Sequence, residues 1–210
     1  RMELADGQHL EAELMLVAVG RGPQTRDLGY PEAGVELDDG FVRVTERLET
    51  SVPRVYAVGD VVRGLQLAHR GFAHGIFVAE EIAHQAGVLE QAPTAIVDAE
   101  VPRVTYCDPE IASVGLSEDE ARTRFGDSET FTYDLTGNGK SQILKTRGFV
   151  KLVRQPSGPV VGVHMIGARV SELVGEAQLI TNWDAFHTDV AGLIHEHPTQ
   201  NEAIGQAHFA

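Results

Sequence analysis

The sequence predicts two fold classes in one chain, an α/β portion in the first half followed by an α+β portion in the second. Two stretches of the first half are typical of parallel strands buried on both faces: the continuous apolar run 14–19, and residues 54–59, which are apolar from Val55 onward. After residue 101, apolar residues first alternate in short strands and then recur at helical spacing. This order of strands and helices predicts an antiparallel sheet with its helices on one face.

Length and composition limit the classes of function. The 210 residues are 42% hydrophobic, which is enough for a core in one large domain or two small ones. The net charge of -14 and the pI near 5.0 argue against nucleic acid or an anionic membrane as partner, because those partners require clustered Lys and Arg. No apolar run approaches the roughly 20 residues of a membrane span. We therefore expect an acidic soluble protein with no nucleic acid and no membrane as partner.

Cys107 is the single cysteine of the chain. It cannot form an internal disulfide, which fits a reducing compartment and predicts a cytoplasmic location. For the same reason these residues cannot reduce a disulfide with their own thiols. The chain opens in mid-pattern with Arg1-Met2-Glu3-Leu4, so we expect the native N-terminus to lie elsewhere.

The first half contains two predicted buried strands and one predicted helix. The run 14–19 ends at Gly20, and a turn-rich stretch follows with a small alternating strand over residues 41–44. The second run, 54–59, closes with Gly59-Asp60. A helix is predicted from Ala68 to near Gly87, because apolar residues recur there every three or four positions. Its inward side chains are expected to be Phe72, Ile76, Ala79, Ile82 and Ala83.

The second half follows a candidate domain boundary at residues 87–101, which contain Pro93 and are followed by Pro102. Ser117 and Glu120 match a capping box that opens a short helix. The turn at 155–159 predicts a hairpin between the strands that flank it. Strands are predicted over residues 101–106, 111–116, 130–135, 148–154 and 160–166, and helices over 171–183 and 189–194.

The segment His195-Glu196-His197-Pro198-Thr199-Gln200-Asn201-Glu202 is the most chemically specific part of the chain. Histidine can take up and release a proton near neutral pH, and a carboxylate on its second nitrogen would fix the tautomer. His197 and Glu202 are therefore candidates for an acid/base pair. Alternatively, residues 199–202 match a capping box, in which Glu202 would only bond a helix start. His195 and His197 could share one strand face, but two histidines without further ligands make a poor zinc site, so we expect no metal.

Two places in the first half are candidates for binding. Asp60 follows a predicted parallel strand, where ligands of α/β folds collect, although a loop aspartate that bonds nearby backbone N–H groups is an equally ordinary interpretation. Gln66, Leu67, Ala68 and His69 lie at the start of the predicted helix, whose free N–H groups favour an electron-rich partner. The alternative there is a plain amphipathic helix start with a solvated His69.

Three motifs together resemble the C-terminal part of the dihydrolipoyl dehydrogenases, which are flavoprotein disulfide oxidoreductases. The motifs are the Tyr-Ala-Val-Gly-Asp segment ending at Asp60, the Leu-Ala-His segment ending at His69, and the His-Pro-Thr-x-x-Glu segment from His197 to Glu202. The resemblance implies the C-terminal tail of NAD/FAD Rossmann-like domains followed by an α+β dimerisation domain. It implies that residues 1–22 end the NAD-binding domain, residues 23–92 close the FAD-binding domain and residues 93–210 form the interface domain.

The resemblance also implies roles for the candidate residues. Asp60 would hold the ribityl chain of FAD, the helix start at residues 66–69 would face the flavin pyrimidine, and Gly20 would let NAD approach the backbone. His197, oriented by Glu202, would deprotonate a dithiol held by the neighbouring subunit of a homodimer. The substrate would be dihydrolipoamide on a 2-oxo acid dehydrogenase complex or on a glycine cleavage protein.

Two alternatives stay open at this point. The family's N-terminal half, with the redox cysteines, is not matched, and no Gly-x-Gly-x-x-Gly follows a strand here. The chain by itself could therefore be a catalytically silent interface module. The parent could also be a related disulfide reductase of the glutathione reductase type, which shares the Pro-Thr-x-x-Glu core, although His195 and the Leu-Ala-His segment favour the lipoamide enzyme. Mercuric reductases are disfavoured because they usually lack the histidine.

Overall fold

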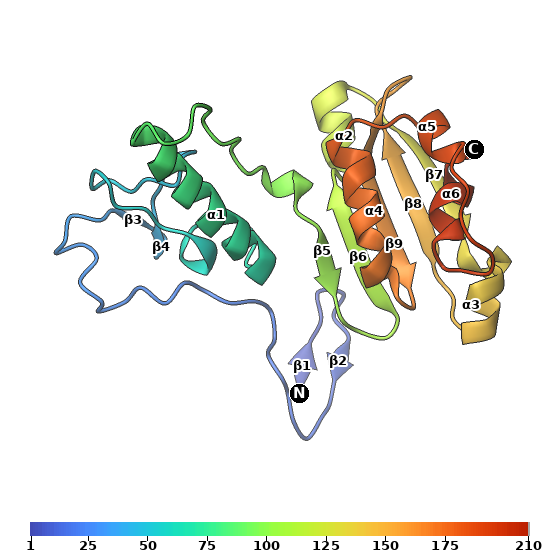
Figure 1. Cartoon of the computed structure of the whole chain (residues 1–210). Helices are drawn as coiled ribbons and strands as arrows, with labels where there is room; N and C mark the ends of the chain where they lie inside the picture. Colours follow the sequence, from blue (N-terminus) through green and yellow to red (C-terminus); the bar gives the residue numbers. More distant parts are fainter. Residues whose placement is uncertain (210) are drawn as a thin grey trace. The chain divides into compact units, whose positions relative to one another are not determined.

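The computed structural model describes residues 1–209 (Figure 1). The chain divides into two compact units, Arg1–Gln66 and Leu67–Ala210. Each unit is described by itself below. No helix within residues 1–209 is both long and apolar enough to cross a membrane.

The second unit is organised around a five-stranded antiparallel sheet of order β5-β6-β9-β8-β7. The predicted hairpin is present, since β8 and β9 pair directly on either side of the turn at residues 155–159. All five predicted strands of this half are confirmed, with ends that differ by no more than two residues. They are β5 (Arg103–Thr105), β6 (Glu110–Gly115), β7 (Glu129–Asp134), β8 (Phe149–Arg154) and β9 (Val160–Gly167).

One face of this sheet forms the core of the second unit. Val114, Val163 and Leu152 lie opposite one another across β6, β9 and β8, and all three are fully buried. Burying a side chain of this size contributes roughly 1.5–3 kcal/mol. Helices α4 (Val170–Asn182) and α6 (Glu202–Ala207) cover this face, with α5 (His187–Ala191) between them in the chain (Figure 1). The α+β prediction is therefore confirmed.

The opposite face of the sheet carries helix α2 (Glu118–Phe125), so the prediction that all helices lie on one face is wrong. Lys151 lies between the buried Val150 and Leu152 and therefore points away from the core, where its ammonium pairs with Glu118 of α2. The capping box of α2 is confirmed: Ser117 Oγ accepts from the Glu120 N–H, and the Glu120 carboxylate accepts from the Ser117 N–H. The ion pair between Lys151 and Glu118 could not be predicted from the pattern of apolar residues.

Helix α1 (Ala68–Gln85) confirms the predicted helix but not its predicted inward face. Its buried residues are Arg70, His74, Phe77 and Glu81. Phe72, Ile76 and Ile82 are 73%, 62% and 48% exposed, because no layer within the described residues packs against that apolar stripe. Two 3₁₀ turns, η2 (Asp98–Glu100) and η3 (Leu135–Gly137), and the short helix α3 (Gly139–Leu144) complete this unit.

The first unit contains two small hairpins, β1 (Met2–Glu3) with β2 (His9–Leu10) and β3 (Leu37–Asp38) with β4 (Phe41–Val42). The strand predicted over 41–44 is thus confirmed in its first half. The buried strand predicted over 14–19 is wrong for this structure, since Leu14 and Leu16 are each 86% exposed and unpaired with any strand of residues 1–209. A parallel strand needs neighbouring strands and covering helices, and the described residues supply none for this run.

The strand predicted over 54–59 is also not formed. Only Tyr56 makes an isolated bridge, to Glu49, and Val55 and Val58 are 42% and 38% exposed. Gly59 instead begins the 3₁₀ turn η1 (Gly59–Val61), and the parallel bridge of this region joins Val62 to Val42. The backbone of residues 55–57 instead pairs loosely with the preceding residues 48–50, through the hydrogen bonds Thr50 N–H to the Val55 carbonyl and Ala57 N–H to the Leu48 carbonyl.

Candidate active site

His197 and Glu202 lie in contact, as the sequence pattern suggested. The imidazole Nδ1 of His197 is 2.8 Å from Glu202 Oε1. His197 lies in the segment between α5 and α6, and Glu202 is the first residue of α6. The His197 side chain is 74% exposed, whereas that of Glu202 is 19% exposed. A partly buried carboxylate therefore supports a solvent-facing imidazole.

Glu202 makes both of the contacts that the sequence left open. Its Oε2 accepts from the Thr199 backbone N–H at 2.9 Å, and the Glu202 N–H lies 3.3 Å from Thr199 Oγ1, which is the reciprocal pattern of a capping box. Its Oε1 remains for His197. The hydrogen bond from the Thr199 N–H, followed by that from His197, lowers the pKa of the Glu202 carboxyl below its ordinary value. Glu202 is thus ionised and accepts a hydrogen bond from the Nδ1–H of His197. In neutral His197 the lone pair therefore lies on Nε2.

His195 has a carboxylate of its own. Its Nε2 lies 2.9 Å from Glu176 Oε1 on α4, and Asn201 Nδ2 donates to Glu176 Oε2 at 2.6 Å. The His195 side chain is only 10% exposed. His195 and His197 therefore hold different partners, and the stretch around them is not a strand. No group of three or more His, Cys, Asp or Glu side chains within residues 1–209 is arranged to hold a metal.

Three candidate cofactor residues belong to the first unit. Gly20 is exposed with a φ of +124°, and a Cβ added there would meet nothing within 4 Å, so the backbone is open to close approach. Asp60 is exposed within η1. Gln66 is half-buried at the end of this unit.

The remaining candidates, Leu67, Ala68 and His69, open α1 in the second unit. Leu67 is the N-cap and makes no side-chain cap hydrogen bond, and the first turn has no acidic residue. This helix start is therefore available to an electron-rich group. His69 Nε2 lies 2.8 Å from the carbonyl oxygen of Pro102.

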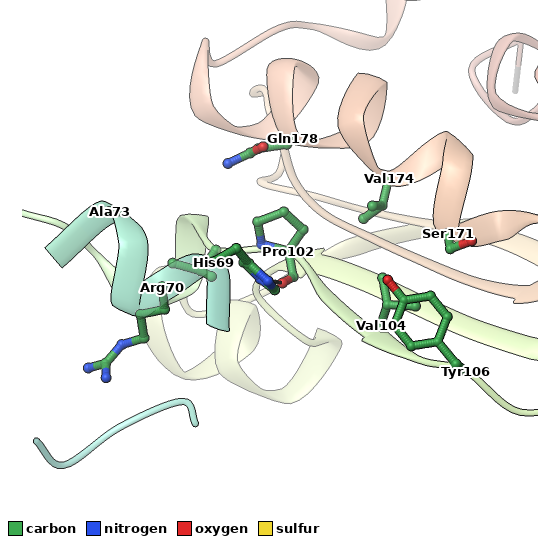
Figure 2. A pocket seen from close by; sticks show the side chains of 10 residues that line it. His69, Arg70, Ala73, Pro102, Val104, Tyr106, Ser171, Val174 and Gln178 are labelled. Atoms are coloured by element: carbon green, nitrogen blue, oxygen red, sulfur yellow. Dashed lines mark hydrogen bonds between the residues drawn. The ribbon is translucent and has the colours of Figure 1, made fainter. Parts of the chain in front are cut away.

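A cavity of about 380 Å³ opens beside this helix start. Figure 2 shows His69 next to Pro102, with Val104 and Tyr106 of the β5 strand region and Val174 of α4 farther along the same cavity. Its lining is mostly apolar, with His69, Arg70, Tyr106, Ser171 and Gln178 as polar members. Apolar side chains with a few polar groups are the usual lining of a small-molecule site.

The structure adds three polar residues that the sequence patterns did not single out. Asn138, Ser141 and Gln200 are 3%, 0% and 6% exposed and are joined by hydrogen bonds. The only local signal was Asn138, an Asn placed before a short polar helix, which is a common N-cap. The pairing of Ser141 with Gln200 spans 59 residues and has no signature in the sequence.

Comparison with known proteins identifies the class of molecule that this geometry belongs to. Residues 101–208 match the dimerisation domain of the pyridine nucleotide-disulphide oxidoreductases, and residues 1–75 match the pyridine nucleotide-disulphide oxidoreductase domain itself. The chain therefore belongs to the pyridine nucleotide-disulphide oxidoreductase family. This finding confirms the family resemblance and the fold class inferred from the sequence.

Dihydrolipoyl dehydrogenases are among the similar curated proteins. The chain is 37% identical over 199 residues to one from Bacillus subtilis (strain 168), covering 94% of this chain and 42% of that protein. It is 38% identical over 201 residues to one from Mycobacterium leprae (strain TN), covering 94% of this chain and 42% of the relative. The chain thus spans less than half the length of these curated relatives.

Solved structures share the fold. LpdA from Mycobacterium tuberculosis superposes with a TM-score of 0.83 at 24% identity, covering 99% of this chain and 44% of that chain. The HOCl-induced flavoprotein disulfide reductase RclA from Escherichia coli gives a TM-score of 0.78 at 21% identity, covering 91% of this chain and 44% of that chain. At these identities the likeness concerns the fold alone.

Proposed function

We propose that the complete protein containing these residues is a dihydrolipoyl dehydrogenase that reoxidises dihydrolipoamide with NAD⁺ as acceptor and FAD as cofactor. In this reaction the dithiol loses two electrons and two protons and becomes a disulfide, while NAD⁺ becomes NADH and one proton is released. The present chain supplies the acid/base pair His197–Glu202 and the dimerisation surface. We assign residues 1–22 to the end of an NAD-binding domain, 23–92 to the closing part of an FAD-binding domain and 93–210 to the interface domain.

The observation that carries this proposal is the 2.8 Å contact between His197 Nδ1 and Glu202 Oε1. Because Glu202 is ionised and holds Nδ1–H, the exposed Nε2 of His197 can accept a proton from a substrate thiol. The resulting imidazolium is stabilised by the carboxylate at its other nitrogen. Proton transfer by a positioned side chain of this kind contributes about 10²–10⁴-fold to a rate.

The residues at the cofactor positions fit a flavin. The helix start at Leu67, Ala68 and His69 lacks a side-chain cap and borders a mostly apolar cavity, which suits the electron-rich edge of an aromatic ring. When bound, FAD supplies the two-electron chemistry that connects the dithiol to the nicotinamide. Exposed Asp60 would accept hydrogen bonds from ribityl hydroxyls, Gln66 would continue the helix-start contact, and Gly20 would let NAD approach the protein backbone.

The cysteine content of the chain bears on the partners that we propose for it. Cys107, the single cysteine of these 210 residues, cannot provide a disulfide pair. We propose that the redox cysteine pair that dihydrolipoamide reduces lies in the part of the protein that these residues do not cover, and that His197 serves the pair of the second subunit of a homodimer, so that the two subunits complete each other's sites. Dihydrolipoamide would arrive on a 2-oxo acid dehydrogenase complex or on a glycine cleavage protein, and the reducing cytoplasm is the compartment proposed.

Two alternatives differ in what they predict. As an isolated piece, residues 1–210 would be a folded but catalytically silent module, which the single cysteine favours. A related disulfide reductase acting on another small disulfide, such as a glutathione reductase-like enzyme, would use the same His197–Glu202 pair. Assays with dihydrolipoamide plus NAD⁺ and with oxidised glutathione plus NADPH on the complete protein distinguish the two substrates.

The direct test is His197→Gln in the complete protein. Dihydrolipoamide turnover is expected to fall by about 10²–10⁴-fold, because the proton acceptor is gone. FAD content, measured by absorbance, and NADH oxidation by ferricyanide, which involves no thiol proton, should be retained. The matched control is Glu196→Gln in the same loop, where the Glu196 backbone carbonyl, not its side chain, accepts from Thr199 Oγ1. Near-normal dihydrolipoamide turnover in His197→Gln would refute the assignment.

A further inference from the structure

The segment that contains His197 is fastened to the rest of the second unit by side chains that are almost completely buried. Asn138, Ser141 and Gln200 are 3%, 0% and 6% exposed. A buried polar group destabilises a protein unless it is hydrogen-bonded, so each such side chain needs a partner. Here the three side chains bond one another and two backbone carbonyl groups.

Gln200 is held at both ends of its amide. Its Nε2 donates to the carbonyl oxygen of Ala168 at 2.8 Å, and its Oε1 accepts from Ser141 Oγ at 2.7 Å. The orientation of the amide is defined by these partners, because only the NH₂ group can face a carbonyl oxygen. Ser141 has a single hydroxyl proton, and its contact with Gln200 is shorter than its 3.2 Å contact with Asn138 Oδ1. The Ser141–Gln200 hydrogen bond is therefore well defined.

Asn138 fastens the neighbouring residue. Its Oδ1 accepts from the Ser141 N–H at 2.9 Å as the N-cap of α3, and its Nδ2 donates to the Thr199 carbonyl oxygen at 2.9 Å. The first turn of α3 thus binds residues 199 and 200, which directly follow His197-Pro198. We call Asn138, Ser141 and Gln200 the loop clamp.

The loop clamp connects directly to the acid/base pair. Thr199, whose carbonyl is bound by Asn138, donates its own N–H to Glu202 Oε2. The imidazole of His197 also lies against α3, since a Cβ added to Gly139 would be 3.6 Å from His197 Cε1. A shift of the loop against α3 would therefore alter both the carboxylate and the ring that it supports.

We propose that Ser141 and Gln200 are positioning residues for His197: their buried hydrogen bond holds the 197–202 loop in the register at which His197 meets Glu202. Neither side chain touches the substrate. Their effect is confined to the proton-transfer step that His197 performs, and the inference rests on the function proposed above. A displacement of a catalytic group by a fraction of an ångström is enough to slow such a step.

The test uses Ser141→Ala and Gln200→Leu in the complete protein. Each is expected to lower kcat for dihydrolipoamide by about threefold to tenfold and to shift its pH profile, with KM changed little. NADH oxidation by ferricyanide should stay within about twofold of wild type, because it does not use His197. A merely structural loss would lower both activities together.

Two further variants sharpen the test. Ser128→Ala removes a buried hydroxyl that has no hydrogen-bond partner within residues 1–209, so it is the matched control and should leave both activities unchanged. In the double variant Ser141→Ala/Gln200→Leu, kcat should be no lower than in Gln200→Leu alone, because one hydrogen bond is lost only once. Additive losses, or parallel losses in both assays, would overturn the proposal.

The proposed function and this inference fail in different ways. If His197→Gln retains turnover, the function itself is wrong. If His197→Gln loses turnover while Ser141→Ala and Gln200→Leu keep the wild-type kcat and pH profile, only the positioning role is wrong.

Discussion

The two units of the chain contrast sharply in how their apolar sequence is used. In the second unit, Val114, Leu152 and Val163 of three adjacent strands are fully buried. In the first unit, Leu14, Leu16 and Val19 form an equally apolar run and are 86%, 86% and 92% exposed. The first unit buries only a few apolar side chains, among them Val35, Val42 and Val62.

This difference shows that an apolar pattern specifies a strand only when its partners are present. The strands of the second unit find theirs within about sixty residues of chain, through the hairpin and the antiparallel ladder. A parallel strand buried on both faces needs neighbours that come from distant βαβ units. The chain spans less than half of its curated relatives, and we infer that the partners of residues 14–19 lie in the part that it does not cover.

The largest expected effect comes from the same substitution made in both units. Leu152→Ala should destabilise the 210-residue chain by about 2–5 kcal/mol, because Leu152 is fully buried and its removal leaves a cavity in the core. Leu16→Ala should change its stability by less than about 0.5 kcal/mol, because that side chain is already in solvent. Urea denaturation monitored by circular dichroism measures both. Equal losses would remove the contrast between the units.

We expect a smaller effect of pH on the free energy of unfolding, because His208, the C-cap residue of α6, is buried. His208 is 1% exposed, and this burial lowers its pKa. The charges of His187 and Arg154 also lower the pKa, whereas Glu176 and the hydrogen bond to the Ile204 carbonyl raise it. Because the folded pKa lies below the ordinary value of 6.5, protonation favours the unfolded chain. Stability should therefore fall as the pH drops below that value, with His164, whose pKa burial also lowers, adding to the loss.

Denaturation midpoints between about pH 7.5 and pH 5 check this prediction. His208→Gln should have a shallower dependence on pH than wild type, whereas replacing the exposed His9 of the first unit by Gln should not alter the slope. An unchanged slope in His208→Gln would show that this histidine is not a source of the acid sensitivity.

The smallest effect concerns the capping box of α2. Ser117→Ala should cost about 1 kcal/mol, since the N–H of Glu120 loses its acceptor. Ser117→Asp, which restores a good N-cap, should recover most of the loss. Thermal unfolding of the three proteins gives the comparison, and a Ser117→Asp variant no more stable than Ser117→Ala would contradict the capping role.

The fold of the second unit could be predicted because its signals are local. Alternation identified the five strands, the Gln155–Pro159 turn identified the hairpin, and Ser117 with Glu120 identified the start of α2. The side of the sheet that α2 occupies could not be predicted, because the contacts that place it there, such as the pairing of Lys151 with Glu118 across 33 residues, are distant in sequence. The inward face of α1 was mispredicted because its apolar stripe lacks a covering layer within the described residues.

The site could be predicted as far as it is local in sequence. His197 and Glu202 are five residues apart, and their contact follows from the short loop that joins them. The partners that support this loop could not be found in the same way. Glu176 reaches His195 across 19 residues, and Ser141 reaches Gln200 across 59, so only the folded chain reveals them. The roles of Gly20, Asp60 and residues 66–69 at a cofactor stay predictions.

The most direct measurement is amide hydrogen exchange on the 210-residue chain, read residue by residue. The second unit has its own core and holds the His197–Glu202 contact, whereas the first unit needs further partners. We therefore expect strong protection in β6, β8 and β9 and exchange near the unprotected rate for residues 14–19. Protection of residues 14–19 equal to that of the sheet would contradict the account.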